Sequence, residues 1–139
     1  MRFKKVLYLV FGILLLSNVA YAQYGQEPGT YLTVTITGGL TETSAIDIYN
    51  YKFAQIVMPT SWTAANLTFK TSPTIDGTYQ SLYDDAGVEV NVTAAVSTNI
   101  AIDVNALKLA ASRFLVIRSG TAATPVTQAS TRTLYLILK

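Results

Sequence analysis

The chain has 139 residues, of which 50% are hydrophobic and 13% are charged, and it contains no cysteine and no histidine. This length suits one domain with a packed core, and the missing residue types exclude disulfides, cysteine metal sites and acid–base catalysis by histidine. From Gln23 onward seven basic residues stand against eight acidic ones, so the domain is nearly neutral and we expect no binding to nucleic acid.

The first 22 residues predict a secretory signal peptide. Basic residues precede an apolar run over 6–16, and Ala20-Tyr21-Ala22 supplies the small-x-small pattern before a cut at Gln23. The alternative is an uncleaved hydrophobic helix, but a membrane-spanning helix needs about 20 apolar residues and this run ends at Ser17. We therefore expect export, with no membrane attachment after cleavage. Residues 23–30 form a polar linker that contains Gly and Pro.

Short runs of alternating apolar and polar residues follow at regular intervals, which is the period-two pattern of half-buried β-strands. Glycine and aspartate clusters separate them and predict turns, for example at Gly38-Gly39 and Asp85-Ala86-Gly87. The segment 59–66 suits a loop or a helical turn, and 106–112 suits a helical turn or a corner between sheets. The expected strands are Tyr31–Thr37, Ser44–Asn50, Phe53–Met58, Leu67–Thr71, Tyr79–Tyr83, Val88–Val92, a strand through Ile100, Ile102 and Val104, Arg113–Ser119 and Thr131–Lys139.

Eight or nine short strands without a long amphipathic helix predict an all-β fold. We expect a single domain over 31–139, an antiparallel β-sandwich of jelly-roll or Greek-key type. Phe53–Met58 and Arg113–Ser119 are apolar on both faces, so they are expected to be central strands. Tyr31–Thr37 has a threonine-rich exposed face and is the expected edge strand.

One acidic cluster, formed by Asp84, Asp85 and Glu89, is a candidate calcium site. Calcium prefers oxygen ligands, although the spacing here lacks the regular alternation of an EF-hand loop. The alternative is a solvated turn in which an aspartate caps the backbone before Gly87. Apart from structural calcium, the sequence predicts no cofactor.

Three aromatic residues are candidates for stacking on a glycan. Trp62 lies in an expected loop, and Tyr79 and Tyr83 border a short expected strand. Exposed aromatic rings can cover the apolar faces of sugars, as they cover other apolar surfaces. The alternative is that these rings pack in strands and corners.

No catalytic residue is assigned. The chain lacks histidine and a G-x-S-x-G nucleophile elbow. Asp84 and Asp85 would point to opposite faces of a strand, so they do not form a glycosidase pair. We therefore expect a non-enzymatic protein.

Four stretches between Ile56 and Lys139 carry a further signal, in this order: IVMPTSWTAANLTFKTS, SPTIDGTYQSLYDDAGVEVNVTAA, RFLVIRSGTAATPVTQAS and TRTLYLILK. Together they resemble a family of small virion-associated proteins found in tailed-bacteriophage and prophage genomes. Members of that family begin near the first strand, so the signal-like leader is a departure. The overlap falls on strands and turns, and it implies a fold and a structural role rather than active-site chemistry.

The resemblance implies a virion component: a head decoration protein, a head fibre or a tail-adjacent module. Its partners would be further copies of the chain or capsid and tail proteins. Because the leader favours export, the same structural role could be played in an extracellular or periplasmic assembly instead of a virion. The strand Arg113–Ser119 is also similar to the closing strand of discoidin-type sandwiches. The alternative function is therefore a secreted carbohydrate-binding module with a glycan partner.

Overall fold

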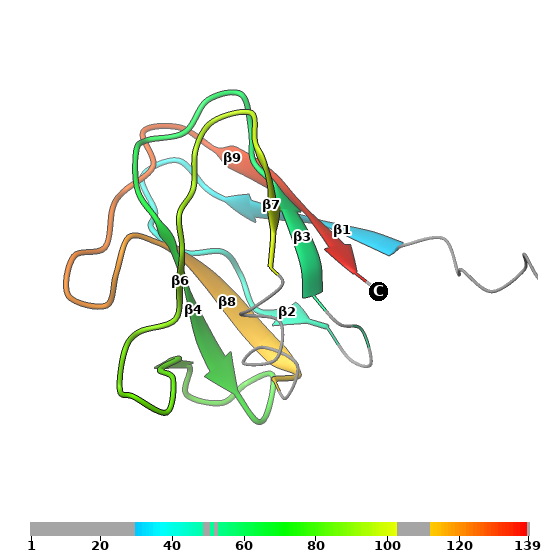
Figure 1. Ribbon diagram of the computed structural model, residues 1–139, viewed down its shortest axis with the longest axis vertical. Helices are drawn as coiled ribbons and strands as arrows, with labels where there is room; N and C mark the ends of the chain where they lie inside the picture. Colours follow the sequence, from blue (N-terminus) through cyan, green and yellow to red (C-terminus); the bar gives the residue numbers. More distant parts are fainter. Residues whose placement is uncertain (1–29, 49–50, 52, 103–111, 139) are drawn as a thin grey trace, which may run out of the picture.

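The computed structural model describes residues 30–48, 51, 53–102 and 112–138, and every regular element within them is a β-strand (Figure 1). The expected leader over 1–22, residues 23–29 of the expected linker and the segment 103–111 lie outside these residues, while Thr30, the last residue of that linker, begins the first strand. No helix in the described part could cross a membrane. The strands are β1 (Thr30–Ile36), β2 (Ile46–Asp47), β3 (Phe53–Val57), β4 (Leu67–Ser72), β5 (Gln80–Ser81), β6 (Asn91–Val92), β7 (Asn99–Ala101), β8 (Phe114–Ser119) and β9 (Arg132–Leu138).

The strands form two antiparallel sheets. The first sheet has the order β1-β9-β3-β7, and the second has the order β2-β8-β4-β5, with β6 also paired to β4. In Figure 1 the first sheet lies in the upper right and the second in the lower left. The expected all-β class is confirmed. So are the expected positions of three strands, because β3 and β8 are interior and β1 is an edge.

The hydrophobic core lies between the two sheets. Val34 and Ile36 of β1 are buried while their neighbours in the strand are exposed, and Leu134, Leu136 and Leu138 of β9 are fully buried. This alternation places one face of each strand in the core, where a buried aliphatic side chain contributes about 1.5–3 kcal/mol. The second sheet meets this layer with four fully buried side chains, namely Leu67, Phe69, Leu115 and Ile117.

Several strands are shorter than the alternation predicts. β2 has two residues within the expected strand Ser44–Asn50, although Ile46 and Ile48 are both buried as expected. Likewise only Asn91–Val92 pair with β4 out of the expected Val88–Val92. The sequence pattern therefore predicts burial better than ladder length, because ladder length depends on how far the partner strand runs alongside.

The segment 59–66, for which a loop and a helical turn were both compatible, is a loop. It follows β3 and leads into β4. Its ends are tied to distant segments, since the carbonyl of Pro59 accepts the N–H of Ser97 at 2.9 Å and that of Asn66 accepts the N–H of Gly120 at 2.8 Å.

Candidate functional site

Two residues of the predicted calcium site, Asp84 and Glu89, already have protein partners. Asp84 Oδ1 accepts the backbone N–H groups of Ala86 at 3.0 Å and Val88 at 2.8 Å. Glu89 accepts the N–H of Ala122 at 3.0 Å. Within the described residues no three Asp or Glu side chains are grouped so that they could hold a metal ion. The geometry favours the alternative, an aspartate that caps its own turn, and calcium binding by Asp84, Asp85 and Glu89 stays a prediction.

The three predicted glycan-stacking residues differ in how much ring surface they present. Trp62 is 8% exposed, belongs to the hydrophobic core, and donates from Nε1 to the carbonyl of Ala65 at 3.0 Å. Tyr79 is half-buried, and its hydroxyl donates to the carbonyl of Ile75 at 3.0 Å. Tyr83 is 51% exposed. Stacking needs an open ring face, which Tyr83 offers and Trp62 does not.

An ion-pair network lies on the outer side of the second sheet. Arg118 of β8 is 4% exposed. It donates from Nε to Glu42 at 3.1 Å, from Nη1 to Glu89 at 3.3 Å and from Nη2 to Ser81 at 2.8 Å. Glu42 also pairs with Lys70 at 3.0 Å. Two cations and two carboxylates thus balance each other, so the network explains how a buried arginine is tolerated without any ligand.

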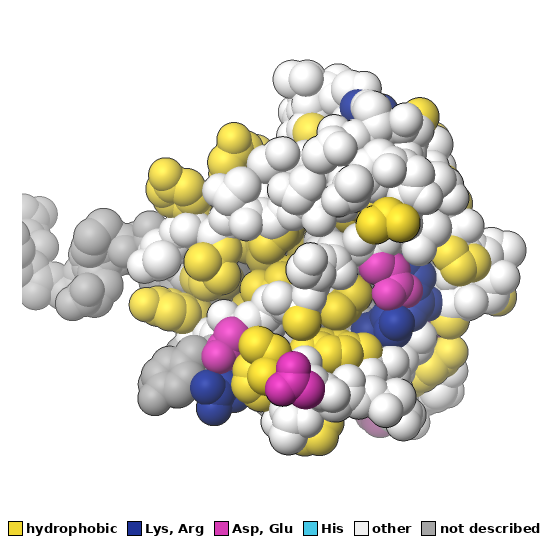
Figure 2. All heavy atoms as spheres, turned by 180° about the vertical axis from the view of Figure 1, so that it is seen from behind, with side chains coloured by type: hydrophobic (Ala, Val, Ile, Leu, Met, Phe, Trp, Pro, Cys, Tyr) yellow, Lys and Arg dark blue, Asp and Glu magenta, His cyan; other side chains and the backbone are white. Residues whose placement is uncertain are grey.

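The outer side of the first sheet has the opposite character. In Figure 2 the acidic side chains lie in the lower and right-hand parts of the visible face, some of them against basic ones, whereas the upper part of the view is hydrophobic or uncharged apart from one basic group near the top. Tyr31 and Tyr135 face outward on neighbouring strands, with an edge-to-face geometry at 6.3 Å between ring centroids. The described outward positions, none of them charged, are Tyr31, Thr33, Thr35, Gln55, Val57, Asn99, Ala101, Thr133, Tyr135 and Ile137.

The border of this uncharged face is β1, an edge strand without the usual protection. Natural edge strands avoid unwanted pairing by being short or by carrying charges, proline or bulges. β1 has seven residues, TYLTVTI, with neither charge nor proline, and it pairs with β9 in one unbroken register. The strands at the other described edges are shorter: β7 has three residues and β2 and β5 have two each. Within the described part of the chain, the outer side of β1 is paired at its last residue alone, by a bridge from Ile36 to Thr43.

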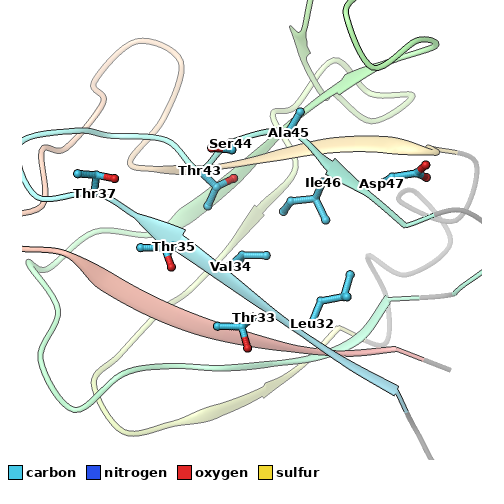
Figure 3. Close-up of a pocket in the computed structure, with 10 residues that line it drawn as sticks. All are labelled: Leu32, Thr33, Val34, Thr35, Thr37, Thr43, Ser44, Ala45, Ile46 and Asp47. Carbon is cyan, nitrogen blue, oxygen red and sulfur yellow. The ribbon is translucent and has the colours of Figure 1, made fainter.

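A groove runs beside this free edge, at the side opening between the two sheets. It has a volume of about 460 Å³ and is bordered by β1 and by the segment that enters β2. Figure 3 shows Leu32 and Val34 on one side of it and Ile46 on the other. A smaller hollow of about 340 Å³ continues it past Thr35 and Thr43. An extended segment laid along β1 would therefore find backbone hydrogen-bonding groups beside a recess lined by both aliphatic and hydroxyl side chains.

The alternation in the sequence indicated the edge strand, but nothing in it indicated the partners of Arg118 or the surroundings of Arg132. Arg118 and Glu42 are 76 positions apart, and Arg132 and its hydrogen-bond acceptor Ser61 are 71 apart. No spacing rule connects such positions; a charged residue within the otherwise apolar strand RFLVIRS was the one available signal for Arg118. No protein-family model, curated protein or solved structure matches the chain.

Proposed function

We propose that the chain is a non-enzymatic structural protein that acts by surface association. It serves as a repeated component of a phage particle, as a head decoration protein, head fibre or tail-adjacent module, or of another extracellular assembly. Its sheets form a jelly-roll or Greek-key sandwich in this proposal. The observation that carries the proposal is β1, a long, uncharged and regular edge strand bordering an uncharged face.

The association occurs by strand addition. Among the described residues no segment pairs with the outer edge of β1 from Thr30 to Thr35. Alternate residues of an antiparallel edge direct both N–H and C=O toward a new neighbour. This gives about six hydrogen bonds, each with a net contribution of about 0.5–1.5 kcal/mol. Association itself costs about 4–15 kcal/mol in lost freedom of motion. A single contact is therefore weak, and it becomes effective where many copies are arrayed together.

The place of action in this proposal is a virion or the extracellular or periplasmic space. The support is the basic-then-apolar leader over 1–22 with its small-x-small end at Ala20-Tyr21-Ala22. In such a setting a nearly neutral surface allows like copies to approach without strong mutual repulsion.

A lysine placed in the middle of β1 tests the association. Thr33 is exposed, so Thr33→Lys leaves the core untouched while adding the charge that natural edge strands use against pairing. The exposed Thr93 lies outside every strand, and Thr93→Lys is the matched control for the added charge.

Sedimentation velocity over a range of concentrations measures the outcome. Wild type and Thr93→Lys are expected to form species larger than one chain as concentration rises, and Thr33→Lys is expected to stay monomeric. A wild type that is monomeric throughout, or a Thr33→Lys variant that assembles like wild type, would contradict the proposal.

A second candidate function is glycan binding by a secreted module. One observation favours it, namely a tyrosine ring, Tyr135, that is 44% exposed and borders a pocket containing Arg132. This site differs from the one expected around Trp62, Tyr79 and Tyr83.

A further inference from the structure

A second pocket lies where β9 begins and β3 ends. It has a volume of about 400 Å³, within the usual range for small-ligand sites, which starts at about 300 Å³. The loop after β3 contributes Pro59 and Ser61, and β9 contributes Arg132, Thr133 and Tyr135. The lining thus combines one cation, several hydroxyl groups and one aromatic ring.

Arg132 in this pocket lacks the carboxylate partner that the other described cations have. Lys70, Arg113 and Arg118 are each paired with a carboxylate. Arg132 makes no ion pair within the described part of the chain, and its hydrogen bond runs from Nη1 to Ser61 Oγ at 2.8 Å. Its Nε is buried and has no acceptor.

The unpaired Nε–H of Arg132 is energetically unfavourable. A buried N–H without an acceptor costs about 1–3 kcal/mol, because neither water nor protein replaces the lost hydrogen bond. A guanidinium presents its N–H groups as a planar fork that matches the two oxygens of a carboxylate. A carboxylate in the pocket would balance the charge of this guanidinium, whose one hydrogen bond within the described residues is that from Nη1 to Ser61.

The aromatic and hydroxyl groups of the lining favour one class of carboxylate ligand over others. Tyr135 is 44% exposed, and its ring is held edge-to-face by Tyr31 with an interplanar angle of 67°. A ring fixed in this way is a ready stacking surface for an apolar ring face. Ser61 and Thr133 add hydroxyl groups that both donate and accept, as the hydroxyls of a sugar require.

We propose that this pocket binds the carboxylate of an acidic sugar, a hexuronate unit of a polysaccharide. Arg132 holds the carboxylate, Tyr135 stacks on the sugar ring, and hydroxyls of the loop and β9 hold the ring hydroxyls. One cation suits one carboxylate, and the nearly neutral domain offers no wider basic surface for a polyphosphate. The site takes a ligand that the proposed association at β1 does not involve.

The test is a calorimetric titration of the full chain with trigalacturonate, beside its methyl ester as an uncharged ligand of the same shape. Wild type is expected to bind the free acid at least about tenfold more tightly than the ester, because the charge-assisted bonds to Arg132 require the carboxylate. Arg132→Gln is expected to bind the acid only as well as the ester, and Arg132→Lys to fall between.

Two tyrosine variants locate the stacking surface. Tyr135→Ala is expected to weaken binding about two- to tenfold, whereas Tyr83→Ala, which removes another exposed ring, is expected to bind like wild type. Arg132→Gln is also expected to sediment like wild type, because the pocket is not part of the β1 edge. Sugar binding and self-association can therefore fail independently of each other.

Three results would overturn the acidic-sugar site. They are equal wild-type affinity for acid and ester, unchanged binding by Arg132→Gln, and absence of heat with trigalacturonate at millimolar concentration. The comparison of acid with ester uses wild type alone, so it decides the question even if a variant fails to fold.

Discussion

The side-chain amide of Gln128 makes hydrogen bonds to both backbone groups of Thr63. Its Oε1 accepts the N–H at 2.9 Å, and its Nε2 donates to the carbonyl at 3.1 Å. The same Nε2 donates to Ser119 Oγ at 2.7 Å. Gln128 is fully buried, so one side chain connects the loop after β3, the end of β8 and the segment before β9.

Replacing Gln128 with leucine is expected to destabilise the fold by about 2–6 kcal/mol. The substitution keeps the volume but leaves the N–H and carbonyl of Thr63 without partners, at about 1–3 kcal/mol each. Urea unfolding measures the loss. Gln80→Leu at an exposed position of β5 is the control and is expected to change stability by about 0.5 kcal/mol or less. Equal losses in the two variants would refute the role of the Thr63 bonds.

The buried ion pair of Arg118 is expected to matter far more than the exposed pair of Arg113. Arg118→Met leaves the carboxylates of Glu42 and Glu89 without this partner, and breaking a buried pair costs about 3–5 kcal/mol. In the exposed pair Arg113 is 53% exposed and Asp47 37%, so Arg113→Met is expected to cost about 0–1 kcal/mol. Chemical unfolding at low and high salt compares them. A loss from Arg118→Met that disappears in high salt would show that the pair behaves as a surface pair.

Two glycines with similar backbone angles are expected to respond differently to alanine. Gly39 has φ 85° and Gly120 has φ 88°, so both substitutions incur about 1–2 kcal/mol of left-handed strain. A Cβ on Gly39 meets nothing within 4 Å, whereas one on Gly120 would collide with the carbonyl oxygen of Thr124 and lie 2.7 Å from the nitrogen of Val126. Gly120→Ala is expected to lose about 1–3 kcal/mol more. Thermal unfolding of both variants provides the comparison, and equal shifts would count against the collision.

The raised pKa of Tyr79 leads us to expect that the free energy of unfolding falls at alkaline pH. Burial, followed by the charges of Asp76 and Asp47, raises the pKa of the Tyr79 phenol above 10.0. Above pH 10 the unfolded chain releases this proton before the folded chain does, so stability falls as the pH rises toward the folded-state pKa.

Tyr79→Phe removes the fall in stability above pH 10, because phenylalanine has no proton to release. It also removes the hydrogen bond to the carbonyl of Ile75. The variant is expected to be about 0.5–1.5 kcal/mol less stable than wild type at pH 7, with a smaller difference at pH 11. Urea unfolding at both pH values measures this. A difference that grows toward pH 11 would show the opposite sign and refute the assignment.

Local sequence was sufficient to locate the strands and to assign three of them to an edge or an interior position. The alternation in TYLTVTI and TRTLYLILK predicted β1 and β9, because a strand turns successive side chains to opposite faces whatever its partner is. Apolar residues on both faces marked β8 as an interior strand for the same local reason. The turn at Asp85-Ala86-Gly87 was also readable, since Gly87 adopts a φ of 74° that glycine tolerates.

Only the tertiary structure decided which polar and aromatic groups meet. Trp62 was a candidate surface residue, yet its ring packs in the core. Arg118 pairs with Glu42, which is 76 positions away in the sequence, and Arg132 donates a hydrogen bond to Ser61, which is 71 positions away. These contacts depend on sheet order and register, which arise from long-range pairing and leave no periodic trace in the sequence. The sequence therefore determined the strands and the edge, and the pairing of the sheets determined which of the described cations has no carboxylate beside it.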